Sequence, residues 1–195
     1  VWHLIFSGVL ERFPTLKVVL TEQGAAWLPR GLETLDWFYR RMTLPEAAES
    51  VYFGAVAAGL SMTPTEYFHR NFWLGASFLR PSEAPLRHEI GVDRIMWGAD
   101  YPHSEGSYGF TTEALRAAFG GVTLRTGHLR AETETRAMVE SNAAAFYGFD
   151  LDLLRPLADR IGPEVEEVAK VLLPDDYPMA STCNAFDKAQ VLRAW

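Results

Sequence analysis

The segment from Arg94 to Gly106, RIMWGADYPHSEG, places the strongest constraint on the fold of this chain. It starts with the uninterrupted apolar run Ile95–Trp97, and Gly98 follows. Such a run is typical of a strand buried on both faces of a parallel sheet, whereas a half-exposed strand alternates apolar and polar residues. Asp100 and His103 come next, and parallel α/β proteins collect their chemistry at the carboxyl ends of strands. The segment therefore predicts a buried parallel strand that ends at Asp100, with a candidate site at that end.

Two further segments predict strands of the same sheet. Residues 16–21 are apolar and β-branched and lead directly into Glu22, a second acid at the carboxyl end of a strand. Residues 71–78 form the next candidate, in which Gly75 and Ala76 allow close approach of a neighbour. Helical sequence separates the three strands, and this alternation predicts an α/β fold with a parallel sheet and right-handed connections.

The helices themselves are predicted from apolar spacing and from the residues that start and stop helices. They are expected at residues 2–11, 25–42, 81–90, 111–119, 131–147, 151–161 and 165–173, with a further helix start at Thr63–Glu66. In the helix at 131–147 the expected inward side chains are Met138, Val139, Ala143 and Phe146. Asp150 is the expected N-cap of the helix at 151–161, and Gly162-Pro163 is expected to close it.

Composition excludes some classes of protein and partner. The chain has 195 residues, of which 48% are hydrophobic and 22% charged, as in an ordinary globular domain. Its net charge is -7 and no basic patch is present, so neither nucleic acid nor an anionic membrane is an expected partner. No apolar run approaches the roughly 20 residues that span a bilayer. The single cysteine, Cys183, excludes an intramolecular disulfide and suits the cytoplasm, the expected location.

Four segments of the sequence together resemble one known family. GADYPHSEG resembles the strand-eight motif of the amidohydrolase-related family, the group typified by aminocarboxymuconate-semialdehyde decarboxylase. Ser7–Trp37 is similar to the strand-six segment of that family, and residues 141–150 and 157–163 are similar to its closing helices. The resemblance implies that the chain is the C-terminal part of a TIM-like (β/α)8 barrel, with strands six to eight and the helices that follow. Such a barrel needs about 250 residues when complete.

The resemblance also implies a domain organisation. Residues 1–163 are expected to form the partial barrel, and residues 164–195 a C-terminal helix and tail that packs on the barrel or extends from it. The sequence starts at Val1, within an expected helix, so we also expect that an N-terminal piece of the protein is missing from it. Members of the family are often dimers, which implies a homodimer, and the aromatic-rich helix at 25–42 is the candidate contact.

Asp100 is the residue to which the resemblance assigns metal chemistry. Family members bind a divalent metal, usually zinc, through a His-x-His pair from strand one, a histidine from strand five and an aspartate from strand eight. Asp100 matches that aspartate, and in an intact relative it would take a proton from metal-bound water. The five histidines of this chain are scattered and contain no His-x-His pair, so the chain alone is not expected to hold zinc tightly.

Four other residues are candidates for the same site. Glu22 is a catalytic candidate, although several relatives carry histidine at this position as an acid or base; alternatively, it pairs with an arginine or caps the next helix. His103 is also a catalytic candidate, and Glu105 a substrate contact, or both position the loop. Arg80 binds a substrate carboxylate or forms a surface salt bridge. The structural alternative for Asp100 itself is a turn former in Asp-Tyr-Pro.

Two classes of function fit these observations. The first is part of a metal-dependent enzyme that hydrolyses or decarboxylates a small carboxylated or aromatic substrate, the chain being inactive by itself. The second is a non-catalytic half-barrel that serves in binding or assembly, or one half of a split enzyme. The presence or absence of His-x-His upstream would separate the two classes.

Overall fold

The computed structural model describes residues 1–77, 79–120 and 128–186 of the chain. Its contacts divide the chain into two compact units. The first consists of Val1–Leu20 and Trp27–Trp73, and the second of Thr21–Ala26 and Leu74–Trp195. The short segment Thr21–Ala26, which follows the first strand, thus belongs to the second unit.

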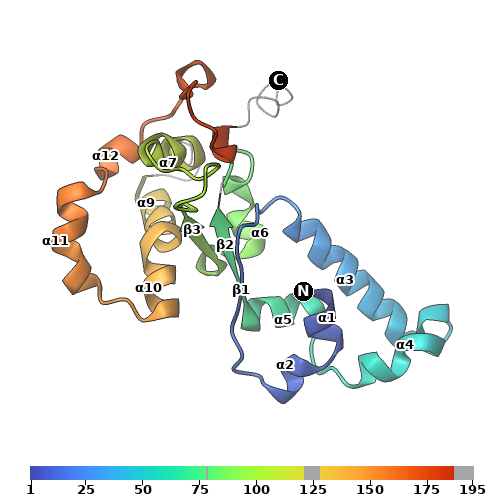
Figure 1. Ribbon diagram of the computed structural model, residues 1–195. Coiled ribbons are helices and arrows are strands. Elements are labelled where there is room, and N and C mark those ends of the chain that lie inside the picture. The colour runs from blue at the N-terminus through green and yellow to red at the C-terminus, as the bar shows by residue number, and fades with distance from the viewer. Residues whose placement is uncertain (78, 121–127, 187–195) are drawn as a thin grey trace. The chain divides into compact units, whose positions relative to one another are not determined.

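The first unit is mainly helical. Its elements are α1 (Trp2–Phe6), α2 (Val9–Arg12), β1 (Val18–Leu20), α3 (Leu28–Thr43), α4 (Ala48–Ala58) and α5 (Pro64–Asn71). The long helix α3 packs against α4 and α5 (Figure 1). The single helix expected at residues 2–11 is wrong, because Gly8 adopts a left-handed φ of 69° that breaks it into α1 and α2.

Polar side chains hold both ends of α5 in this unit. The Thr63 hydroxyl accepts from the Glu66 amide, and the Glu66 carboxylate accepts from the Thr63 amide, which forms the capping box of α5. At the other end of α5 the buried Asn71 donates from Nδ2 to the carbonyl oxygens of Pro14 and Leu16, at 3.0 and 2.7 Å. Asn71 therefore fixes the segment that enters β1.

The predicted parallel sheet is present. The strands follow the order β1-β2-β3, with β2 at Phe72–Ser77 and β3 at Ile95–Gly98. β2 and β3 are parallel, and Leu74 lies opposite Ile95 in the register. Both of these side chains are fully buried, as expected for a strand covered on both faces. The strand therefore ends at Gly98, two residues before the Asp100 that was expected to end it.

The second unit is mainly helical outside its strands. Its other elements are η1 (Ala84–Leu86), α6 (Arg87–Ile90), η2 (Val92–Arg94), α7 (Thr111–Phe119), α9 (His128–Arg136), η3 (Ala137–Ser141), α10 (Asn142–Tyr147), α11 (Leu151–Ile161), α12 (Val165–Val168), η4 (Pro174–Asp176) and η5 (Asn184–Phe186). The expected helices at 81–90 and 165–173 were too long, whereas Asp150 caps α11 as predicted and accepts from two backbone amides. None of the helices in the described part of the chain combines the length and the apolar character that a membrane crossing requires.

The helix expected at 131–147 contains a turn of π-helix. This turn, η3, joins α9 to α10 without ending the helical path. A π-turn holds about one residue more than an α-helical turn, so side chains within and after it depart from ideal α-helical spacing. Met138 is fully buried as expected, but Val139 is 37% exposed, which corrects its expected inward position.

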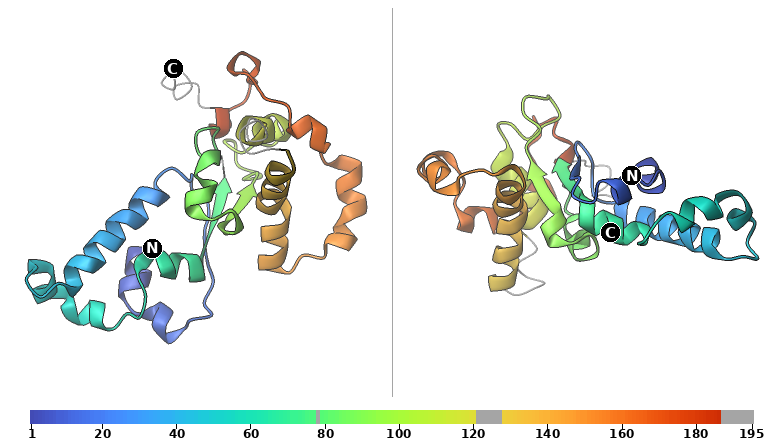
Figure 2. Two further views of the ribbon diagram at one scale, coloured as in Figure 1. Left: turned by 180° about the vertical axis from the view of Figure 1, so that it is seen from behind. Right: turned by 90° about the horizontal axis from the view of Figure 1, so that it is seen from below.

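The helix η3–α10 packs against β3, and Figure 2 shows it beside the strand in both views. Asn142 makes the polar connection between them, since its Nδ2 donates to the carbonyl oxygens of Val92 and Ile95 at 2.8 and 2.7 Å. This amide holds the start of β3 as Asn71 holds the approach to β1.

The residues before the described end of the chain cover α7. The cluster consists of Ala114, Ala117, Leu172, Tyr177, Cys183, Ala185 and Phe186, with Trp97 of β3 and Phe110 packed against it. The segment at 172–186 is thereby attached to the helix that follows the RIMWGADYPHSEG segment. This packing supports the loop between β3 and α7.

The role of Asn142 can be tested by removing its donors. We expect Asn142→Asp to destabilise the protein more than Asn142→Ala, because the carboxylate faces two carbonyl oxygens. The alanine variant should lose about 1–3 kcal/mol of unfolding free energy, the usual effect of leaving buried polar groups unpaired. Urea denaturation measures both, with Ser141→Ala, an exposed neighbour, as the control. Equal stability of wild type and Asn142→Asp would contradict this role.

Candidate metal centre

The loop after β3 is closed by its own backbone. The His103 amide donates to the Asp100 carbonyl at 2.9 Å, and the Gly106 amide to the His103 carbonyl at 3.0 Å. The Ser107 amide then donates to the Ala99 carbonyl at 2.8 Å and closes the loop. A Cβ atom at Gly106 would lie only 2.8 Å from the Asp100 carbonyl oxygen, so this position requires glycine. The loop therefore holds Asp100 and His103 in one arrangement.

Two site residues have an unusual backbone conformation. Glu22 and Asp100 have φ values of 53° and 57°, and among the described residues they are the non-glycine residues with positive φ. Each lies two residues beyond the end of a strand, Glu22 after β1 and Asp100 after β3. The left-handed conformation costs about 1–2 kcal/mol for a residue with a Cβ. Such strained residues cluster at functional sites, so these two positions are candidates for function.

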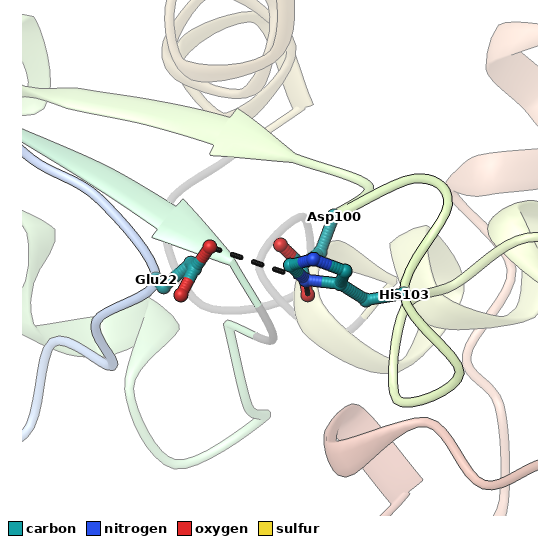
Figure 3. Close-up of side chains that lie close together, drawn as sticks. All are labelled: Glu22, Asp100 and His103. Atoms are coloured by element: carbon teal, nitrogen blue, oxygen red, sulfur yellow. Dashed lines mark hydrogen bonds and ion pairs between the residues drawn. The ribbon is translucent and has the colours of Figure 1, made fainter.

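The side chains of Glu22, Asp100 and His103 converge (Figure 3). Each offers one ligand atom, and these atoms all lie within 4.8 Å of one another. His103 Nδ1 is 3.1 Å from Asp100 Oδ2 and 3.9 Å from Glu22 Oε1. The Asp100 side chain is only 8% exposed, whereas those of His103 and Glu22 are 52% and 61% exposed. The group is thus open to solvent on one side and has a nearly buried carboxylate on the other.

The electrostatics of this group favour a cation. The hydrogen bond to Asp100 and the charge of that carboxylate raise the pKa of His103, and the charges of Glu22 and Glu105 act in the same direction. A protonated imidazole therefore neutralises part of the acidic cluster. A divalent cation can do the same, and two carboxylates with one imidazole are ligands that zinc and similar metals accept. The three residues present fit a divalent metal.

Glu105 lies on the same loop but outside this group of three. Its carboxylate accepts from the Ser104 hydroxyl at 3.2 Å, and its pKa is lowered by its own backbone amide and by that hydroxyl. The segment before the described end supports its backbone, since the Asn184 amide donates to the Glu105 carbonyl and the Thr182 hydroxyl to the Ser104 carbonyl. Its expected role as a substrate contact stays a prediction.

The expected role of Arg80 in binding a substrate carboxylate also stays a prediction. Its Nε is buried and has no hydrogen-bond partner among the described residues. Within the same part of the chain, no ion pair of its guanidinium is seen that would support the alternative of a surface salt bridge. Its backbone amide donates to the Glu83 carboxylate at 2.9 Å.

Glu83 is a buried polar residue whose role the sequence pattern did not predict. This residue was expected only as part of a helix start, but its carboxylate is buried and accepts from the Ala26 amide, 57 residues away in the chain. No local pattern signals a contact of that separation. The one hint in the sequence is a glutamate in the first turn of the helix expected at 81–90, shortly after the strand at 71–78.

Comparison with known proteins identifies the family. The chain belongs to the amidohydrolase family, whose sequence profile matches residues 3–149. It is also similar to a solved structure of the amidohydrolase map2389c from Mycobacterium avium subsp. paratuberculosis K-10, at 23% sequence identity and a TM-score of 0.47. That similarity covers 73% of this chain and 30% of the other, so the chain spans 30% of the length of that structure.

The raised pKa of His103 gives a prediction for solution. Protonation of His103 should stabilise the fold at pH below its unfolded-state pKa of about 6.5, and the contribution should disappear as the pH rises through the higher folded-state value. We expect Asp100→Asn to lower the pKa of His103, because the principal partner loses its charge. NMR titration of the imidazole measures it.

The control for this titration is Asp93→Asn. Asp93 pairs with Arg94 instead of His103, so its amide variant should leave the pKa of His103 unchanged. An Asp100→Asn protein with an unaltered His103 titration would show that the two side chains are not paired in solution.

Proposed function

We propose that this chain supplies Glu22, Asp100 and His103 to the metal centre of a metal-dependent enzyme of the amidohydrolase type. The observation that carries the proposal is the convergence of these three side chains beyond the carboxyl ends of β1 and β3. The left-handed backbone at both acids supports it, since neither conformation is needed for the strands themselves. The family match supports the same chemistry.

The protein groups have distinct roles in the proposed reaction. A divalent metal bound here, which we propose to be zinc, would lower the pKa of a water molecule and polarise a substrate carbonyl. Asp100, nearly buried and acceptor-only when ionised, takes a proton at its carboxylate. His103 Nδ1, 3.1 Å from Asp100 Oδ2, orients that carboxylate, and the imidazole is available as a ligand once it has lost its proton. Glu22 adds a second negative charge that favours a cation in the centre.

The substrate is proposed to be a small carboxylated or aromatic molecule. Arg80 is the candidate for binding a substrate carboxylate, and Glu105 for a polar contact near the loop. Hydrolysis of an ester, lactone or amide is the reaction that the family name favours. Decarboxylation, as in the aminocarboxymuconate-semialdehyde decarboxylase branch, is the related alternative and would use the same aspartate for proton transfer. The remaining metal ligands would come from outside this chain.

Metal binding tests the proposal without any substrate. We expect Co²⁺ to shift and broaden the amide signals around residues 22, 100 and 103 in the NMR spectrum of the chain. Binding should tighten with rising pH, because His103 must lose its proton to become a ligand. Asp100→Asn should weaken the affinity by about tenfold or more, as loss of a carboxylate near a metal does.

Asp93→Asn is the control for the metal titration, because it removes an exposed carboxylate of the same unit away from the centre. Broadening spread evenly over the acidic surface, with no effect of Asp100→Asn, would refute a metal site here. That result would favour the non-catalytic half-barrel.

Activity tests the role of Asp100 in an enzyme that contains this chain. Asp100→Asn should lower kcat by about 10²–10⁴-fold, the usual contribution of one acid or base. Acid release from a panel of esters and lactones reports hydrolysis, and release of carbon dioxide from carboxylated substrates reports decarboxylation. Circular dichroism of the variant controls for misfolding. An Asp100→Asn enzyme of wild-type kcat would remove Asp100 from the mechanism.

A further inference from the structure

One buried carboxylate of the second unit, that of Glu83, is not part of the candidate metal centre. Glu83 is only 2% exposed, and among the described residues it makes no ion pair. Its Oε1 accepts from the Ala26 amide at 3.0 Å, and its Oε2 accepts from the Arg80 amide at 2.9 Å. A buried carboxylate is unfavourable unless hydrogen bonds compensate it, and bonds to an ionised acceptor are the stronger kind. Glu83 thus joins the segment after β1 to the segment after β2.

Gly24, in the segment after β1, leaves the space that the Glu83 carboxylate occupies. A Cβ atom at Gly24 would lie 2.7 Å from Glu83 Oε1, closer than a real Cβ approaches another atom. The carboxylate can therefore reach the Ala26 amide only because residue 24 has no side chain. Gly24 and Ala26 together fix the backbone immediately after Glu22.

Glu22 needs such support more than the other members of the centre. Asp100 and His103 lie on a loop closed by three backbone hydrogen bonds. Glu22 is exposed, has a left-handed backbone, and lies 3.9 Å from His103 Nδ1, too far for a hydrogen bond. Its place in the centre thus depends on the segment Thr21–Ala26.

We propose that Glu83 is a positioning residue, whose buried carboxylate holds the segment Thr21–Ala26 so that Glu22 faces Asp100 and His103. Glu83 is not itself a member of the group of three, and it acts through the Ala26 amide. The same carboxylate holds the backbone of Arg80, the candidate for substrate binding. The consequence for metal binding rests on the function proposed above, whereas the consequence for the segment does not.

Amide hydrogen exchange tests the positioning without a metal. In Glu83→Gln one of the two amides loses its acceptor, because the side-chain amide presents only one oxygen. We expect exchange at Ala26 or Arg80 to accelerate about tenfold, the effect of losing one hydrogen bond to a charged acceptor. Glu89→Gln, an exposed glutamate of α6, is the matched control and should change neither rate. Unchanged exchange at both amides in a folded Glu83→Gln protein would overturn the proposal.

Gly24 provides a second variant pair. Gly24→Ala should accelerate exchange at Ala26, because the new methyl group displaces the Glu83 carboxylate. In a Glu83→Ala background the same glycine change should add nothing, because the atom it collides with is gone. Equal effects of Gly24→Ala in the two backgrounds would mean that the contact does not operate in solution.

Metal affinity separates positioning from a general structural role. If Glu83 acts through Glu22, then Glu83→Gln and Glu22→Gln should each weaken Co²⁺ binding, and the double variant should bind as weakly as Glu22→Gln alone. Additive losses would overturn positioning through Glu22. If wild type binds no Co²⁺, the proposed metal centre fails, and the exchange rates at Ala26 and Arg80 still decide whether Glu83 holds the segment.

Discussion

The parallel pairing of β2 with β3 is the constraint on which the candidate centre depends. In a parallel sheet, strands end at the same edge, and the segments that leave them meet there. Each acid of the centre lies two residues beyond a strand, where the ladder no longer dictates the backbone and a left-handed conformation becomes accessible. Asn142 supports this geometry at the opposite end of the strand, since its side-chain amide fixes the start of β3. The position of Asp100 therefore depends on the four-residue strand β3, which is held by its pairing with β2 and by the hydrogen bonds of Asn142.

The centre concentrates negative charge, and the imidazole of His103 compensates part of it when it is protonated. Asp100, Glu22 and Glu105 all raise the pKa of His103, so the imidazole retains a proton to higher pH than an isolated histidine. A proton on His103 and the proposed divalent metal would each compensate the same negative charge. The buried carboxylate of Glu83 is compensated by the backbone amides of Ala26 and Arg80 in place of a cation. Glu22 is thus exposed and available for a cation, whereas the buried carboxylate of Glu83 binds the amides of Ala26 and Arg80.

The elements that were correctly predicted from the sequence are those in which local chemistry decides the structure. The apolar run Ile95–Trp97 predicted β3, and Asp150 predicted the N-terminus of α11, because burial and capping act within a few residues. Prediction failed where the local pattern permits two outcomes. Gly8 fits a helix or a break, and in the structure its left-handed φ of 69° produces the break. Val139 lies within the π-turn η3 and is exposed, and an ideal period of 3.6 residues does not anticipate such a turn.

The candidate centre shows the same division. The sequence by itself determined the residue types, the strands that they follow, and the resemblance that drew attention to Asp100, Glu22 and His103, because these depend on composition and order along the chain. Only the tertiary structure decided that the three side chains meet, that both acids take a left-handed backbone, and that Glu83 bonds to an amide 57 residues away. The physical reason is that such contacts arise when parallel strands bring distant segments to one edge, and no local propensity encodes which partners meet there.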